Sequence, residues 1–426
     1  MAQGFCSKIL IRLRIGDMRI GLMAYHAACN FGASLQLLST YMYLRNHGHE
    51  PLIINWVAQD LEAYYRRTTP AEQFAMQEQI RRLLWTETEL CRTEEDVARV
   101  IETENIEAVI IGSDAVAQNH SLLERLTFPC RTIVGLLGAT SDTQFPNPFW
   151  ATWLPLLHRH IPVAVMSASN QDSSYRLFSP NVRRAMAQCV EQYSYLSVRD
   201  EWTRKMFVAL SHGKRQPKVT PDPVFAFNQN VAALLPSRQD ILQRFGLPDK
   251  YVLLSFLPTQ RPSVSQEWLD EFSALAATEG YACVMLPFSH KESFGKLSQV
   301  IALPLNPIDW YALIKYSAAY VGNNMHPIIV AIHNQIPFFS FDTYGTKHFN
   351  GLYVDESSSK IRHILNTASF PDYRIGCTSR HFVAPTPSKV WQKLACFDRN
   401  KCENFALSCL ENYNQMMNDI IHSFAK

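Results

Sequence analysis

Short apolar segments rich in β-forming residues alternate with longer helical runs along most of this chain of 426 residues. At its start, residues 18–25 and 51–57 predict strands. The run 33–46 between them predicts a helix, because its apolar residues recur every three or four positions. Strands that alternate with helices favour parallel sheets covered by helices on both faces. The sequence therefore predicts an α/β fold.

The same alternation continues after this first unit. Further strands are predicted at residues 107–111, 162–168, 195–198, 251–257, 281–288, 319–322 and 337–341. Helices are predicted at residues 266–278, 308–316 and 327–334. Around residues 221–236 this alternation is replaced by a stretch interrupted by proline and asparagine residues, which indicates a domain boundary.

We therefore expect two Rossmann-like domains that face a cleft, where ligands of such folds bind at the carboxyl ends of the strands. The predicted division is an N-terminal extension at 1–17, a first α/β domain at 18–229, a second at 230–387 and a helical tail at 388–426. A charged helical insertion is expected within the first domain, at about residues 60–106.

Charge and cysteine usage narrow the class of protein. A formal net charge of +2 gives no strong field for nucleic acid or an anionic membrane, so an anionic partner needs a local cluster of cations. No apolar run approaches the ~20 residues that span a bilayer, and we read no signal peptide at the start. The ten cysteines form no C-x-x-C pair, which is typical of a reducing compartment. We expect a cytoplasmic protein without a metal site.

The most informative stretch surrounds His326. A strand ends at Gly322, and a helix is predicted to begin at His326 and Pro327, where proline at the first helical position is pre-organised. The free N–H groups of that first turn form an anion site, and a histidine beside them can lend a proton or a positive charge. The plainer alternative is that His326 only caps the helix.

A second candidate stretch follows the first predicted strand and contains His26, Asn30 and Gly32. Gly32 permits close approach of the backbone to a ligand. The stretch lacks G-x-G-x-x-G, so a dinucleotide site is not supported. His26 is either catalytic or only provides hydrogen bonds at the end of the strand.

Charged residues follow other strands. Arg199 comes directly after residues 195–198 and offers a rigid fork for phosphate or carboxylate; the alternative is a local ion pair with Asp200 or Glu201. Asp114, Asp222 and Lys347 also follow apolar segments, where α/β sites are built. Singly, these signals are weak.

In their order along the chain, these motifs resemble the polysaccharide pyruvyl transferase family. The resemblance rests on Ile20-Gly-Leu, Tyr25-His and Asn30-Phe-Gly-Ala-Ser-Leu-Gln36, then Val109-Ile-Ile-Gly-Ser-Asp114, Ser197-Val-Arg-Asp-Glu201, Asp222-Pro-Val-Phe225, and His326 with the helix and strand behind it. It covers roughly residues 18–350.

The resemblance implies a fold similar to GT-B glycosyltransferases and transfer of a pyruvyl group from phosphoenolpyruvate onto a sugar, as a ketal, in the synthesis of a surface polysaccharide such as a capsule or exopolysaccharide. Arg199, His326 and, less directly, Lys347 match the family's residues for the donor. Asn324 stands where many members carry arginine. Asp114 or Asp222 would accept hydroxyl protons, and no cofactor besides the co-substrate phosphoenolpyruvate is required.

Two other functions stay open at this point. A GT-B glycosyltransferase would use a nucleotide sugar, although no carboxylate for its base and ribose is evident. A non-catalytic binding subunit of a glycan-assembly complex is consistent with Asn324. For the transferase we expect a sugar or lipid-linked glycan as acceptor, and peripheral association with a membrane through that acceptor.

Overall fold

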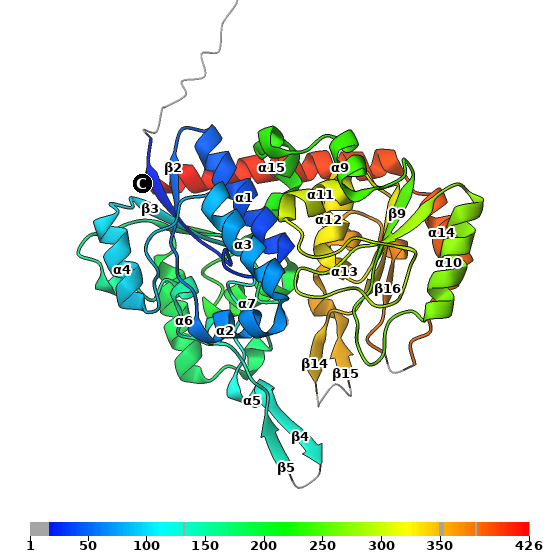
Figure 1. The fold of residues 1–426 in the computed structure, drawn as a ribbon. Coiled ribbons are helices and arrows are strands. Elements are labelled where there is room, and N and C mark those ends of the chain that lie inside the picture. The colour runs from blue at the N-terminus through cyan, green and yellow to red at the C-terminus, as the bar shows by residue number, and fades with distance from the viewer. Residues whose placement is uncertain (1–16, 131–132, 172, 349–352, 380, 426) are drawn as a thin grey trace, which may run out of the picture.

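The computed structural model describes residues 17–130, 133–171, 173–348, 353–379 and 381–425 (Figure 1). The predicted extension at 1–17 lies outside the described residues except for Asp17.

The first sheet is parallel throughout and has six strands in the order β2-β1-β3-β6-β7-β8. These strands are β1 (Arg19–Met23), β2 (Glu50–Ile53), β3 (Ala108–Asp114), β6 (Val163–Ala168), β7 (Tyr195–Val198) and β8 (Lys218–Val219). Apolar residues of α4 (Glu94–Thr103), α6 (Pro180–Gln192) and α7 (Glu201–Leu210) pack on one face of this sheet. Helix α1 (Phe31–Asn46) packs on the other face.

The second sheet is also parallel and six-stranded, in the order β11-β10-β9-β12-β13-β16. Its strands are β9 (Tyr251–Ser255), β10 (Ala282–Met285), β11 (Gln299–Val300), β12 (Ala319–Gly322), β13 (Phe338–Asp342) and β16 (Arg374–Gly376). Helices α10 (Gln266–Thr278) and α14 (Pro387–Ala395) cover its outer face. Toward the first domain lie α9 (Arg238–Phe245), α11 (Pro307–Lys315), α12 (Met325–His333) and α13 (Lys360–Thr367).

Two parallel α/β sheets on either side of shared helices confirm the predicted fold class and its GT-B-like arrangement. The predicted helical insertion contains α2 (Gln59–Thr68), α3 (Ala71–Leu84) and α4. The first sheet uses residues up to 219 and the second begins at 251; the division of the chain at 229/230 stays a prediction.

Several predicted boundaries were wrong. Strand β3 continues to Asp114 instead of ending at residue 111, and α12 begins at Met325, so His326 lies inside the first turn. The predicted strand at 51–57 ends at Ile53. Two hairpins and α13 had not been predicted: β4 (Leu126–Cys130) with β5 (Ile133–Leu136), and β14 (Thr346–His348) with β15 (Tyr353–Asp355).

The long helix α15 (Arg399–Phe424) runs across both domains (Figure 1). It contacts β6 and β7 of the first domain and α12 of the second. Tyr413, Met416 and Met417 on this helix are at most 1% exposed, and their core cluster includes residues of both sheets. The predicted helical tail therefore completes a core that the two domains share.

This shared core leads to a stability prediction. Met417→Ala is expected to lower the free energy of unfolding by about 2–5 kcal/mol, because it leaves a cavity between the domains. Leu407→Ala is the matched control, since Leu407 lies on the same helix but is 52% exposed, and we expect a change within about 0.5 kcal/mol. Urea unfolding followed by circular dichroism measures both. Equal effects of the two substitutions would contradict the packing role of α15.

Candidate active site

Four of the predicted site residues meet where strand ends of both sheets face each other. Asp114 is the last residue of β3, and Arg199 directly follows β7. Asp222 caps the short 3-10 helix η5 (Pro223–Ala226), which contacts α1, α12 and α15. His326 is the second residue of α12, directly behind β12. Residues far apart in sequence therefore form one cluster at the carboxyl ends of the strands.

Arg199 is the centre of this cluster. Its side chain is 7% exposed, with Nη1 2.9 Å from Asp222 Oδ2 and Nη2 3.2 Å from Asp114 Oδ1. The predicted alternative, a local ion pair, is wrong. Asp200 instead accepts a hydrogen bond from the Thr203 backbone N–H to cap α7, and Glu201 pairs with Arg204. A buried guanidinium needs such close carboxylate partners.

Asp222 is fully engaged by its neighbours. Its Oδ1 accepts from the backbone N–H of Val224 at 3.0 Å, and its Oδ2 accepts from Arg199 and from Gln36 Nε2. The same Oδ2 lies 3.9 Å from His326 Nε2. With both oxygens occupied, the geometry suits a positioning residue better than the catalytic base that the sequence predicted.

Asp114 is the more accessible carboxylate, with 14% of its side chain exposed. Burial alone would raise the pKa of this carboxyl. The charges of Lys360 and Arg199, and that of His326 when it is protonated, outweigh burial and lower the pKa of Asp114 to about 2. Asp114 is therefore ionised at neutral pH.

His326 is 6% exposed, and its Nε2 has no hydrogen-bond partner among the described residues. Burial lowers the pKa of the imidazole, whereas the nearby Asp222 and Asp114 partly raise it. The ring is therefore neutral at pH 7 and carries a buried nitrogen without a partner.

Gly32, at the start of α1, lies against the imidazole of His326. A Cβ at this position would overlap the ring atoms Nδ1 and Cγ, so only glycine leaves room for the histidine. The predicted close approach at Gly32 is thus to a side chain of the second domain. Asn30 caps α1 by accepting from the Ala33 backbone N–H at 3.3 Å.

Lys360 is the cation that the sequence analysis missed. It is the first residue of α13, and its Nζ lies 3.8 Å from Asp114 Oδ1. The sequence does contain a helix-start pattern here. Ser359, which caps this helix, precedes the apolar residues Ile361, Ile364 and Leu365 at helical spacing. A predicted helix start there would have placed Lys360 near the cleft.

The remaining predicted residues lie differently. His26 is 1% exposed and uses both ring nitrogens, toward Ala24 O at 3.1 Å and Asn55 Oδ1 at 2.9 Å, so the structure does not bring it to the cluster. Asn324 is the half-buried residue before α12, and its side chain makes no capping hydrogen bond. Lys347 lies in β14, but its side chain falls outside the described residues.

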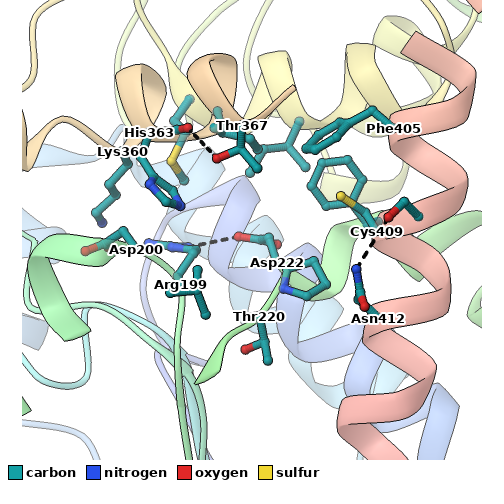
Figure 2. A pocket seen from close by; sticks show the side chains of 17 residues that line it. Arg199, Asp200, Thr220, Asp222, Lys360, His363, Thr367, Phe405, Cys409 and Asn412 are labelled. Carbon is teal, nitrogen blue, oxygen red and sulfur yellow. Dashed lines mark hydrogen bonds and ion pairs between the residues drawn. The ribbon is translucent and has the colours of Figure 1, made fainter. Parts of the chain in front are cut away.

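A cavity of about 170 Å³ adjoins the cluster (Figure 2). Arg199, Asp222 and Lys360 line it together with apolar residues of α15, among them Phe405 and Cys409. The Nε of Arg199 has no partner among the described residues. One side of the guanidinium therefore has hydrogen-bonding capacity left for a ligand.

Charge within the cluster is balanced. Arg199 and Lys360 supply two positive charges, and Asp114 and Asp222 supply two negative ones. The N-terminus of α12 adds partial positive charge beside His326. An anion therefore binds here most favourably when it replaces a carboxylate as the partner of Arg199 or Lys360, or when His326 becomes protonated.

Comparison with solved structures finds similar shapes at low identity. UDP-GlcNAc 2-epimerase from Methanocaldococcus jannaschii matches at 11% identity, a TM-score of 0.49, and 92% and 98% coverage of this chain and that chain. The corresponding enzyme from Neisseria meningitidis, bound to UDP-GlcNAc, matches at 10% identity, a TM-score of 0.48, and 93% and 100% coverage. The glycosyltransferase SnogD from Streptomyces nogalater matches at 12% identity, a TM-score of 0.44, and 96% and 98% coverage. Similarity at this level supports no conclusion about activity.

No curated protein sequence matches the chain at a significant level. Among the described residues, no helix is both long and apolar enough to cross a bilayer. A model of the family described as "Polysaccharide pyruvyl transferase" matches residues 30–344, which include Asp114, Arg199, Asp222 and His326. The chain therefore belongs to the polysaccharide pyruvyl transferase family, a family of transferase enzymes.

Proposed function

We propose that the protein transfers a pyruvyl group from phosphoenolpyruvate to two hydroxyls of a sugar, forming a ketal on a glycan precursor. The observation that carries the proposal is the unpartnered Nε2 of His326, which lies beside the Arg199 and Asp222 pair. A donor with a carboxylate, a phosphate and a basic methylene carbon needs cations and one acid in this kind of arrangement. Transfer in the synthesis of a surface polysaccharide, in the cytoplasm, remains the expected setting.

In this mechanism Arg199 and Lys360 bind the donor's anionic groups, together with the first N–H groups of α12. His326, protonated when the donor binds, gives its proton to the methylene carbon, and C2 becomes an oxocarbenium-like electrophile. A first sugar hydroxyl attacks C2 and gives its proton to Asp114, and the C–O bond to phosphate breaks. A second hydroxyl closes the ketal and gives its proton to the now neutral imidazole of His326. The products are inorganic phosphate and the pyruvylated sugar.

Asp114 is the base in this scheme. Its low pKa makes it a weak base while Arg199 and Lys360 hold it. When the donor takes part of those positive charges, the pKa of Asp114 rises and the carboxylate accepts a hydroxyl proton more readily. Asp222 keeps Arg199 and His326 in place.

The direct test incubates the protein with phosphoenolpyruvate and a panel of glycan acceptors. We expect phosphate release that requires an acceptor, with one pyruvyl group gained by the acceptor in mass spectrometry. His326→Ala is expected to lower kcat by about 10² to 10⁴, as removal of a general acid does. His422→Ala is the matched control, because His422 is an exposed histidine on α15.

Two outcomes of this test point elsewhere. Turnover of a nucleotide sugar without use of phosphoenolpyruvate would favour a glycosyltransferase. Saturable acceptor binding without turnover of either donor would favour a binding subunit. If His326→Ala loses thermal stability but keeps full activity per folded molecule, the histidine is only a cap.

The lowered pKa of His326 generates a second prediction. Because the imidazole is neutral in the free protein at pH 7, donor binding is expected to take up a proton. Titration calorimetry in buffers of different ionisation enthalpy measures this uptake. His326→Gln should show less uptake than wild type, and the difference separates the imidazole from the donor's own phosphate.

The sign of the pH dependence follows from the same shift. The protonated imidazole is the active form, so kcat/KM should fall as pH rises through a value below 6.5, the pKa of an ordinary histidine. The pKa seen in kcat should be higher, because the bound donor stabilises the imidazolium. Equal proton uptake by wild type and His326→Gln would contradict this role.

Gly32→Ala tests the placement of the imidazole. The added methyl group must push the ring away, and we expect a loss of about 10² in kcat, the cost of a misplacement near 1 Å. Gly138→Ala is the control, because no atom of the described residues lies within 4 Å of a Cβ at that position. Full activity of Gly32→Ala would show that catalysis does not need His326 in its present position.

A further inference from the structure

An apolar surface with no partner in the described structure lies at the base of the β4–β5 hairpin. Leu122, Leu123, Leu136 and Leu137 are 65%, 61%, 52% and 57% exposed, and we call these four residues the leucine face. Leu122 and Leu123 belong to the single-turn helix α5 (Leu122–Arg125), which leads into β4. The backbone N–H of Leu137 donates to Arg125 O at 2.8 Å, so the two pairs of leucines lie close together.

Interfacial aromatic side chains continue this surface. Glu124, in the same turn as Leu122, accepts from the backbone N–H of Ser174 at 3.0 Å and joins α5 to the 3-10 helix η4 (Tyr175–Leu177). Leu177 is 43% exposed, and the ring of Tyr175 lies 5.7 Å from that of Trp202. Tyrosine and tryptophan are enriched where an apolar layer meets water.

Positive charge surrounds these residues. Residues 174–184 contain three arginines and no acidic residue. Arg176 and Lys205 are exposed and line a cavity of about 350 Å³ together with Trp202. Asp355 and Ser357, next to the β14–β15 hairpin of the second domain, line the same cavity. Asp355 is acidic, so the positive charge beside the leucines comes from the first domain, with Arg176 and Lys205.

Chain length limits how far the leucine face can lie from the candidate active site. The two hairpins project on the same side of the molecule, one from each domain (Figure 1). Asp114 and Leu122 are eight positions apart, which limits their separation to about 27 Å even for a fully extended chain. A substrate bound at a membrane under this surface would lie within reach of the cleft.

We infer that the leucine face, with Arg176 and Lys205 beside it, docks on the surface of an anionic lipid bilayer. Leucines that enter the acyl region and cations that meet anionic headgroups are the two contributions to such binding. A second copy of this chain fits less well, because pairing the same face would bring like charges together. The inference rests on the proposed function in one respect: it makes the acceptor a lipid-linked glycan presented at that bilayer.

Co-sedimentation with vesicles tests the docking surface. We expect the wild-type protein to pellet with phosphatidylcholine vesicles that contain phosphatidylglycerol, and less with phosphatidylcholine alone. The double variant Leu122→Asp with Leu123→Asp should lose binding by roughly tenfold or more, since charged groups do not enter the acyl layer. Leu136→Asp with Leu137→Asp should do the same independently.

Two further variants complete the design. Leu407→Asp is the control, because Leu407 is an equally exposed leucine on α15. It should bind vesicles like wild type. Arg176→Glu with Lys205→Glu should remove the preference for phosphatidylglycerol and leave the weaker binding to phosphatidylcholine.

Three outcomes would overturn the inference: wild type that pellets with neither vesicle, leucine variants that bind like wild type, or leucine variants that abolish a concentration-dependent dimer but leave vesicle binding unchanged. Turnover of phosphoenolpyruvate with a water-soluble acceptor should be the same in wild type and the leucine variants. Absence of vesicle binding by the wild type with that turnover intact would refute only the docking surface. Vesicle binding without any turnover would refute only the proposed function.

Discussion

The buried ion pair between Arg199 and Asp222 is the interaction on which the rest of the site depends. Arg199 comes from the first sheet, and Asp222 begins the segment that contacts α1, α12 and α15. Removing either partner would leave an uncompensated buried charge, which is among the most destabilising changes a core can suffer. Because Asp222 also accepts from Gln36 and lies beside His326, the pair fixes side chains of both domains relative to one another. The geometry around the imidazole is therefore set before any ligand arrives, and this is the condition for efficient electrostatic catalysis.

The same pair explains why the cluster does not act as a simple well of positive charge. Two cations face two carboxylates, and beside them lies a histidine, His326, whose pKa burial has lowered. In such a site, the net positive charge appears only when the ligand binds and the histidine becomes protonated. Small neutral molecules and water meet a balanced network, whereas a ligand that carries both a carboxylate and a phosphate changes the protonation of the network that binds it.

Much of this architecture was readable from the sequence, and the failures have physical causes. The parallel strands were found because their residues are buried on both faces and form continuous apolar runs. Asp114, Arg199 and His326 were found because polar residues directly follow such runs. Lys360 was missed because its helix has only eight residues and no strand leads directly into it. Asp222 and its partner Gln36 are nearly 200 positions apart, and Gly32 and His326 are nearly 300 positions apart. No local sequence pattern encodes either contact.

Helix α15 has a consequence for how the chain can be divided. The order of elements along the sequence suggests two halves, yet the final helix covers β6 and β7, which belong to the beginning. A fragment made of the first domain alone would expose the sheet face that α15 covers, and a fragment of the second alone would carry α15 without its contacts to β6 and β7. Neither half alone therefore contains a complete core. When the first 230 residues have left the ribosome, the hydrophobic core is still open, and it closes only after α15 has been synthesised.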